Sequence, residues 1–148
     1  MLAAAPLAVG CGSSRANVDA GATPATDSGA DGPEAPGCRG DYQGSVEDYP
    51  NDSWHVVGNG AGRVVLARDD TGLYAYSARC THGDCDVALV DAFGRTRCPC
   101  HGAEFDGNGQ VTRGPATVDL PHVAVAVCGR RVFVDVTTAV PATMRVVP

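Results

Sequence analysis

The sequence predicts an all-β fold, a sandwich or barrel of short antiparallel strands, and three observations support this prediction. Apolar residues make up 44% of the 148 residues and gather in short valine-rich runs. Nineteen glycines and ten prolines lie between these runs, and both residue types favour turns. We find no amphipathic stretch of ten or more residues with helical periodicity. Short strands separated by turns at this spacing are typical of sandwiches and barrels.

The strands, in chain order, are predicted at residues 63–68, 73–77, 87–90, 95–97, both ends of 105–111, 123–127 and 131–135. The turn Asp69-Asp70-Thr71-Gly72 joins the first two strands into a hairpin. The turn Cys128-Gly129-Arg130 joins the last two, whose alternating valines make this hairpin the clearest of the set. We therefore expect a folded domain over residues 38–137, followed by a C-terminal tail over 138–148.

The first eleven residues predict an export signal that ends at a lipid-carrying cysteine. Residues 1–10 are small and apolar, and Ala8-Val9-Gly10-Cys11 resembles the cleavage box of a bacterial lipoprotein. The stretch is shorter than the ~20 apolar residues that span a bilayer, and it lacks the basic region of a secretory signal. We therefore expect residues 1–11 to be the end of a truncated signal whose upstream part precedes Met1. A slightly apolar chain end without a signal function is the alternative.

The segment over residues 12–37 predicts a disordered linker. It consists mainly of alanine, glycine, aspartate, proline, serine and threonine, and it contains no aromatic residue. Such a segment cannot bury enough apolar surface to offset the entropy lost on ordering. If Cys11 carries lipid, this linker is a flexible tether between the membrane and the folded domain; without lipid it is a low-complexity tail.

The charge and the cysteine content narrow the possible functions. The formal net charge of −6 and the lack of a basic patch argue against nucleic acid as a partner, because phosphates attract basic surfaces. In a reducing cytosol most of the seven cysteines would be metal ligands or reactive thiols, whereas outside it the spare ones could pair. They are Cys11, Cys38, Cys80, Cys85, Cys98, Cys100 and Cys128.

Two segments combine cysteine and histidine at a spacing that suits a metal centre. The first is Cys80-Thr81-His82, and after fifteen further residues the second is Cys98-Pro99-Cys100-His101. Each supplies a thiolate and an imidazole, and the tetrahedral irons of a [2Fe–2S] cluster need two such outside ligands each. Structural zinc sites usually space their ligands as Cys-x2–4-Cys and His-x3–5-His, which these pairs do not match. A zinc-stapled binding module, and unlinked thiols with surface histidines, are the alternatives.

The two segments resemble the boxes of the Rieske iron–sulfur family, in the form Cys80-Thr81-His82 and Cys98-Pro99-Cys100-His101-Gly102. Gly114-Pro115-Ala116 also resembles the Gly-Pro-Ala loop beside the cluster in that family, and the resemblance covers roughly residues 42–135. It implies a β-sandwich of antiparallel sheets with one [2Fe–2S] cluster held by loops at one tip. It also implies one-electron transfer between a donor and an acceptor protein.

The resemblance further implies which side chains bind iron. Cys80 and Cys98 are expected to bind one iron through sulfur, and His82 and His101 are expected to bind the other through nitrogen. Replacing two thiolates by neutral imidazoles removes negative charge from the centre, so an added electron is accommodated more easily.

The spare cysteines acquire a role through the same resemblance. In the high-potential branch of the family a disulfide links the two cluster loops, and Cys85 and Cys100 fall at its two positions. That bond implies an oxidising compartment, in agreement with an exported N-terminus; two free thiols beside the cluster are the alternative. Cys38 and Cys128 remain, and a second disulfide between them is one connectivity that the sequence allows.

Three positions depart from the quinol-oxidising members of the family. Ala103 and Phe105 stand where those members carry serine and tyrosine, and Gly83 stands where they carry a bulky leucine. We therefore expect an exported, lipid-anchored electron carrier, or the small Rieske subunit of a periplasmic oxidoreductase, at the periplasmic or cell-envelope face. A Rieske subunit of a quinol–cytochrome c reductase-type complex is the alternative. His55 and His122 lie outside both boxes and are expected to be structural or surface residues.

Overall fold

The computed structural model describes residues 37–148, and the ten strands among them pair only in antiparallel fashion. The predicted signal segment, Cys11 and the predicted linker up to residue 36 lie outside the described residues. The strands are β1 (Asp41–Ser45), β2 (Ser53–Val57), β3 (Val64–Asp69), β4 (Gly72–Ser77), β5 (Ala88–Leu89), β6 (Thr96–Arg97), β7 (Glu104–Phe105), β8 (Val111–Arg113), β9 (His122–Cys128) and β10 (Arg131–Ala139). The helices of this part are the single 3-10 turns η1 (Val46–Asp48) and η2 (Gly60–Gly62), and neither has the length or the apolar character to span a bilayer.

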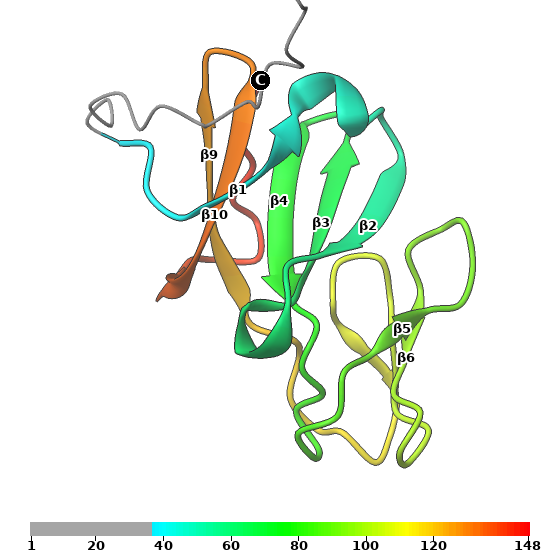
Figure 1. Ribbon diagram of the computed structural model, residues 1–148. Coiled ribbons are helices and arrows are strands. Elements are labelled where there is room, and N and C mark those ends of the chain that lie inside the picture. Colours follow the sequence, from blue (N-terminus) through cyan, green and yellow to red (C-terminus); the bar gives the residue numbers. More distant parts are fainter. Residues whose placement is uncertain (1–36) are drawn as a thin grey trace, which may run out of the picture. The chain divides into compact units, whose positions relative to one another are not determined.

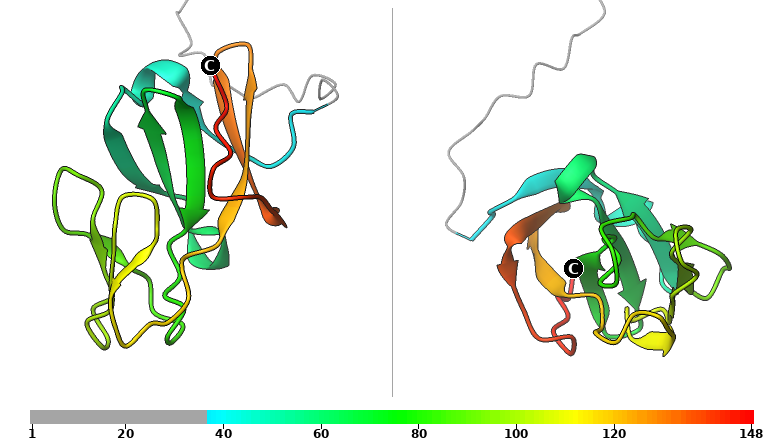
Figure 2. Two further views of the ribbon diagram at one scale, coloured as in Figure 1. Left: turned by 180° about the vertical axis from the view of Figure 1, so that it is seen from behind. Right: turned by 90° about the horizontal axis from the view of Figure 1, so that it is seen from below.

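The strands form two sheets, which confirms the predicted all-β antiparallel architecture. The larger sheet has the order β1-β10-β9-β4-β3-β2, and the smaller one has the order β5-β6-β7-β8. The larger sheet is strongly curled, and the smaller sheet lies beside its β2 end (Figures 1 and 2). Because β4 and β9 are neighbours in the larger sheet, the smaller sheet is an insertion between two paired strands.

The core has two parts because the central strands are buried on both faces. In β3, Val65 and Ala67 face a core shared with the smaller sheet, whereas Val64 and Leu66 face a second core inside the curl of the larger sheet. All four side chains are at most 1% exposed. A continuous apolar run, without polar alternation, is expected of a strand covered on both sides. The predicted cysteine and histidine boxes belong to the insertion that completes the first core.

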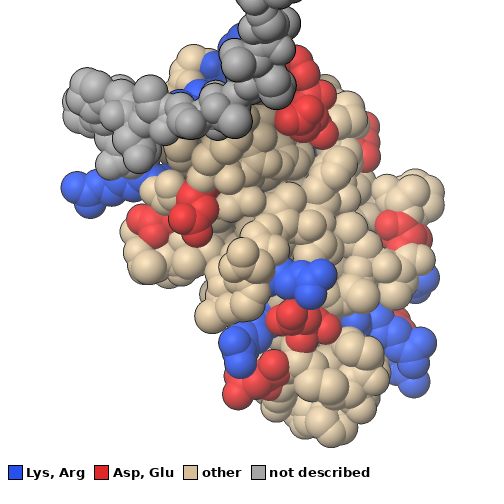
Figure 3. All heavy atoms as spheres, viewed as in Figure 1, with Lys and Arg blue, Asp and Glu red and all other residues tan. Residues whose placement is uncertain are grey.

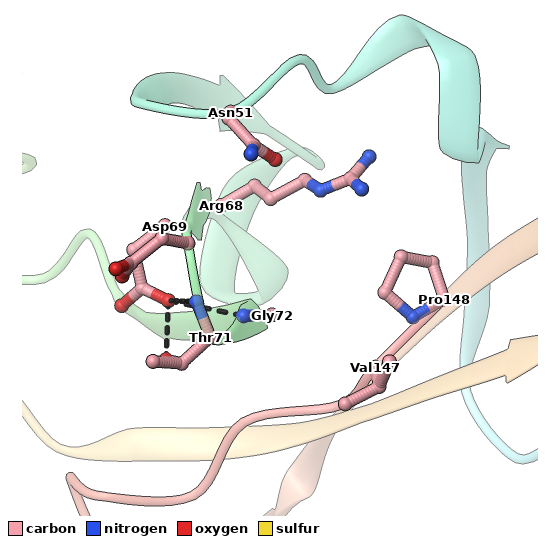
Figure 4. A pocket seen from close by; sticks show the side chains of 8 residues that line it. Asn51, Arg68, Asp69, Thr71, Gly72, Val147 and Pro148 are labelled. Carbon is pink, nitrogen blue, oxygen red and sulfur yellow. Dashed lines mark hydrogen bonds between the residues drawn. The ribbon is translucent and has the colours of Figure 1, made fainter.

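The turn between β3 and β4 is stabilised by one carboxylate. Asp69 Oδ1 accepts hydrogen bonds from the backbone N–H groups of Thr71 at 2.9 Å and of Gly72 at 3.0 Å, and from the Thr71 hydroxyl at 2.5 Å. Figure 4 shows this turn beside the C-terminal residues Val147 and Pro148, which line a hollow together with Arg68. The predicted turn is therefore present, and the end of the chain packs next to it.

The chain beyond residue 137 does not leave the domain. β10 runs to Ala139, and further on Val146 pairs with Leu73 of β4 through two backbone hydrogen bonds of 2.9 Å each. The tail predicted at residues 138–148 thus begins inside a strand and then packs along the larger sheet. The backbone groups make the pairing in this part of the chain. The polar side chains of Thr137 and Thr138 give no hydrophobic pattern from which the strand could be predicted.

Candidate metal centre

Three loops meet at one end of the insertion, and two of them carry the predicted boxes. They join β4 to β5, β6 to β7 and β8 to β9, and all three lie at the lower end of the view in Figure 1. Strands β5 to β8 of the insertion are only two or three residues long, so the insertion is mostly a frame for these loops.

The first box lies in the β4–β5 loop, which is closed by backbone hydrogen bonds. The Cys80 N–H donates to the Cys85 carbonyl at 2.9 Å, and the Val87 N–H donates to the Ala78 carbonyl at 2.7 Å. The Thr81 hydroxyl donates to the carbonyl of Val118 in the β8–β9 loop at 2.5 Å. The third loop, which contains the sequence Gly-Pro-Ala, is thereby tied to the first box.

The second box is a tight hairpin loop between β6 and β7. The Cys98 N–H donates to the Ala103 carbonyl at 2.8 Å, and the Gly102 N–H donates back to the Cys98 carbonyl at 3.0 Å. Gly102 has a φ of 77°, a left-handed conformation that side-chain-bearing residues adopt at a cost. This glycine therefore lets the loop reverse immediately after His101.

The four predicted ligands divide into a buried pair and an exposed pair. Cys80 and Cys98 are the two free cysteines of the described residues, and they are 4% and 0% exposed. His82 and His101 are both exposed, and their ring centroids lie 4.8 Å apart. The two boxes thus bring two sulfurs together inside the domain and two imidazoles together at its surface.

The surroundings of the Cys80 sulfur favour the protonated thiol when no cation is bound. Burial raises the pKa of the Cys80 thiol, and the neighbouring Cys98 sulfur adds to this effect. The backbone N–H groups of His82 and Gly83 point to the Cys80 sulfur and act in the opposite direction. A coordinated metal ion deprotonates a thiol outright and would therefore overcome this preference at Cys80.

A disulfide joins the two box-bearing loops. Cys85 is bonded to Cys100, the pair that the family resemblance implied, with their Cα atoms 6.4 Å apart. The Cys98 sulfur lies within 4.8 Å of both sulfurs of this bond. Because the disulfide consumes the thiols of Cys85 and Cys100, Cys98 is left as the thiol donor of this group, and Cys80 is the other free thiol of the described residues.

Arginines around the tip are paired with acidic side chains. Arg79 lies 3.3 Å from Asp84, and Glu104 is shared between Arg97 at 3.9 Å and Arg113 at 3.4 Å. In Figure 3 blue and red atoms alternate above a tan lower tip. Val118 of the third loop is 62% exposed, so the surface near the histidines offers apolar contact with little net charge.

Sequence reasoning missed the side chains that hold the insertion on the larger sheet. The Trp54 indole N–H and the Tyr74 hydroxyl both donate to the Gly107 carbonyl, at 2.8 and 2.9 Å. A Cβ on Gly94 would lie 2.3 Å from the Trp54 ring, so this glycine permits the close approach. The sequence shows only a tryptophan and some glycines that are far apart along the chain, and nothing in it indicates that they are in contact.

The two histidines outside the boxes, predicted to be structural or surface residues, both pack against tyrosine rings. His122 is 4% exposed, stacks on Tyr74 with centroids 5.9 Å apart, and its Nε2–H donates to the Asn108 carbonyl at 2.9 Å. Burial lowers its pKa. His55 lies on β2 and packs edge-on against Tyr49.

The donor set fits the centre that the resemblance implied. Two thiols converge in a dry core and two imidazoles converge at the surface, which suits an elongated group with two metals and two kinds of ligand. The all-sulfur group of Cys85, Cys98 and Cys100 does not offer such a set while its disulfide is intact.

Comparisons with known proteins agree with this geometry. The family model of the Rieske [2Fe-2S] domain matches residues 42–126. The cytochrome b6-f complex iron-sulfur subunit of Synechococcus sp. (strain CC9605) is 39% identical over 72 residues, which are 49% of this chain and 40% of that subunit. The chain therefore spans less than half the length of the curated relatives that it matches first.

Two solved structures share the fold. The crystal structure of the cyanobacterial plasma membrane Rieske protein PetC3 from Synechocystis PCC 6803 matches with a TM-score of 0.54 and 33% identity, over 64% of this chain and 97% of that one. A hyperthermophilic respiratory complex III matches with a TM-score of 0.51 and 19% identity, over 62% and 72% of the two chains, and shows the fold alone. With the family match over residues 42–126, these findings show that the chain belongs to the Rieske [2Fe-2S] domain family and carries one [2Fe–2S] cluster.

Proposed function

We propose that Cys80 and Cys98 bind the inner iron of the cluster and that His82 and His101 bind the outer iron. The observation that supports this assignment is the division of the four side chains into a buried thiol pair and an adjacent, exposed imidazole pair. The cluster supplies one-electron chemistry when bound. The buried sulfurs keep water from one end of it, and the two imidazoles carry the other end to the surface.

From this assignment we infer that the chain passes single electrons between a donor and an acceptor protein. The partner would approach at His82 and His101, where Val118 offers apolar contact and the nearby arginines are already paired. A tip with little net charge favours contact through shape and apolar area over long-range steering. Electron transfer at this tip should therefore depend weakly on salt.

We further infer an exported protein at the cell envelope. The disulfides Cys85–Cys100 and Cys38–Cys128 support an oxidising compartment. We propose that Cys11 carries lipid and tethers the domain to the membrane, because the residues before it resemble a lipoprotein cleavage box. Membrane fractionation of cells that express wild type and Cys11→Ala checks this: release of the variant alone into the soluble fraction supports the anchor, and equal distribution overturns it.

Two molecular settings remain for the electron carrier. An independent carrier, or the small subunit of a periplasmic oxidoreductase, is favoured by Gly83, Ala103 and Phe105, which depart from quinol-oxidising members. A subunit of a quinol–cytochrome c reductase-type complex is the second candidate, because relatives are named as subunits of the cytochrome b6-f complex. Co-purification from membranes under mild detergent distinguishes the two by the presence or absence of a b-type cytochrome.

The ligand assignment is tested by spectroscopy on anaerobically reconstituted protein. Wild type should contain two irons, accept one electron and show a mixed-ligand signal by electron paramagnetic resonance after reduction. Cys80→Ala and His82→Ala should lose this signal, whereas the matched control His55→Gln, a histidine on β2, should keep it. A colourless wild type, or an unchanged signal in His82→Ala, would overturn the proposal.

A further inference from the structure

Three cysteine sulfurs lie together at the tip, and the cluster assignment uses only one of them. The sulfurs of Cys85, Cys98 and Cys100 all lie within 4.8 Å of one another. Cys98 is fully buried, Cys85 is half-buried and Cys100 is exposed. The trio therefore extends from the core to the surface, where both a reductant and a metal ion can reach it.

We propose that reduction of the Cys85–Cys100 disulfide creates a three-thiolate site for one Zn²⁺ ion, built from Cys85, Cys98 and Cys100. A dithiol reductant supplies two electrons and two protons to the bond, becomes a disulfide itself and leaves two thiols. The bound Zn²⁺ then displaces the protons of the three thiols, as thiolates are the form that binds metal. No electron passes to or from the zinc.

The present geometry is already close to what zinc requires. Tetrahedral zinc with Zn–S bonds of about 2.3 Å holds its sulfurs about 3.8 Å apart. Opening the disulfide separates Cys85 and Cys100 toward that spacing, and Cys98 already lies within 4.8 Å of both. Cys98 and Cys100 come from one loop and Cys85 from the other, so the ion would join the same two loops that the disulfide joins.

A fourth thiol, that of Cys80, lies beside the three and can stabilise the bound ion. Cys80 lies in contact with Cys98, so it can take the fourth position, which otherwise falls to water. This set consists of sulfur alone, unlike the two-sulfur, two-nitrogen set assigned to the cluster. Zinc accepts either three or four thiolates in protein sites.

The consequence is a choice between two metal centres that share Cys98. With the disulfide formed, Cys85 and Cys100 cannot bind metal, and Cys98 is free for the cluster. With the disulfide open, zinc takes Cys98 and excludes the cluster. The disulfide thus protects the cluster ligand from the wrong metal, an inference that rests on the proposed role of Cys98.

The experiment uses the full apo chain in the Cys38→Ser/Cys128→Ser background, so that the remote disulfide contributes no thiols. Zn²⁺ alone is titrated in competition with a chromophoric chelator, before and after reduction, and Co²⁺ reports thiolate ligands through charge-transfer absorption. The reduced protein should bind one equivalent with thiolate bands, at least tenfold more tightly than the oxidised protein. Circular dichroism checks that each variant is folded.

Adding Cys85→Ser/Cys100→Ser to this background is the matched control, and it should lose the tight binding even under reducing conditions. Zinc loaded first should also block cluster reconstitution in the reduced parent. Equal zinc affinity in the parent and in the Cys85→Ser/Cys100→Ser variant, or in the oxidised and reduced parent, would overturn the zinc site. Failure of the oxidised protein to form a cluster would instead overturn the ligand assignment.

Discussion

At the scale of single residues, Ala103 and Phe105 set the hydrogen bonds available beside the second box. Both side chains are fully buried in the same core cluster as Cys98, and neither can donate a side-chain hydrogen bond. Hydrogen bonds to cluster sulfur stabilise the reduced, more negative state and raise the potential. We therefore expect a potential below that of family members with serine and tyrosine at these positions.

Redox titration of Ala103→Ser and Phe105→Tyr checks this expectation. Each substitution adds one hydroxyl donor, and each should raise the potential by up to about 65–130 mV. A charge-assisted hydrogen bond contributes roughly 1.5–3 kcal/mol, and 59 mV corresponds to a tenfold change for one electron. Ala103→Gly adds no donor and should leave the potential close to that of wild type. If neither hydroxyl variant rises, hydrogen bonding at these positions does not control the potential.

Another single residue, His122, makes folding stability depend on pH. Burial against Tyr74 and Tyr76 lowers its pKa from 6.5, and the nearby Arg145 adds to this effect. The hydrogen bond to the Asn108 carbonyl and the charges of Asp106 and Asp119 act in the opposite direction. The unfolded chain therefore binds a proton at a pH where the folded chain does not. The stability that neutral His122 contributes is present above about pH 6.5 and is lost as the pH falls below it.

Urea unfolding between pH 5 and pH 8 measures this dependence. Wild type should lose stability steadily below about pH 6.5, and His122→Gln, which has no titrating ring, should show a flatter profile. His55→Gln, on strand β2 of the same sheet, should retain the slope that His122 supplies. The same slope in His122→Gln as in wild type would assign it to other groups.

At the scale of elements, the segment after β10 fastens two turns to the larger sheet through Arg145. Its Nε donates to Asp69 Oδ2 at 2.7 Å and its Nη2 donates to Asn108 Oδ1 at 2.9 Å. The guanidinium lies 3.6 Å above the centre of the Tyr74 ring. Asp69 belongs to the β3–β4 turn and Asn108 to the β7–β8 turn, so one side chain connects both sheets.

Arg145→Ala should lower the free energy of unfolding by roughly 2–3 kcal/mol, because it removes charge-assisted hydrogen bonds and a cation–π contact from a site only 17% exposed. Arg63→Ala is the matched control, since its ion pair with Asp86 is about 40% exposed and should contribute less than about 1 kcal/mol. Chemical denaturation of both variants measures the difference. Similar losses would mean that the Arg145 contacts are no stronger than a surface pair.

Elements differ in how far the sequence alone predicts them. The hairpins β3–β4 and β9–β10 follow from valine-rich runs and turn residues, which act locally. β1 (Asp41–Ser45) was not predicted, because its sequence Asp-Tyr-Gln-Gly-Ser is polar and its pairing with β10 is made by the backbone. The contacts between the insertion and the larger sheet were missed for another reason: they depend on pairs such as Trp54 and Gly107, which are distant in sequence.

The candidate centre was more predictable than the frame that positions it. Each box holds its chemistry within a few residues, so residue type and spacing indicate the metal centre without knowledge of the fold. What the boxes cannot reveal is their environment. That Cys80 and Cys98 are buried while His82 and His101 are exposed follows from the packing of the insertion on β3 and β4.

At the scale of the whole molecule, the two disulfides have different roles. Cys38–Cys128 stabilises mainly the fold, and Cys85–Cys100 joins the loops of the candidate centre. Cys38–Cys128 joins the start of the described domain to the end of β9 across 90 residues of sequence, and Cys85–Cys100 spans 15. In the chain-entropy account these loops correspond to about 4–5 and about 3 kcal/mol of stability. Neither Cys38 nor Cys128 packs in the core cluster that contains Cys80 and Cys98.

We therefore expect the paired variants to separate stability from redox behaviour. Cys38→Ser/Cys128→Ser should lose more stability in denaturant, yet keep the cluster potential of wild type. Cys85→Ser/Cys100→Ser should lose less stability, yet shift the potential and shorten the lifetime of the bound cluster, because its loops carry the four predicted ligands. Denaturation and redox titration of the two holoproteins side by side measure both effects. A changed potential in Cys38→Ser/Cys128→Ser would mean that the curled larger sheet transmits strain to the tip, and that the insertion is not an independent frame for the centre.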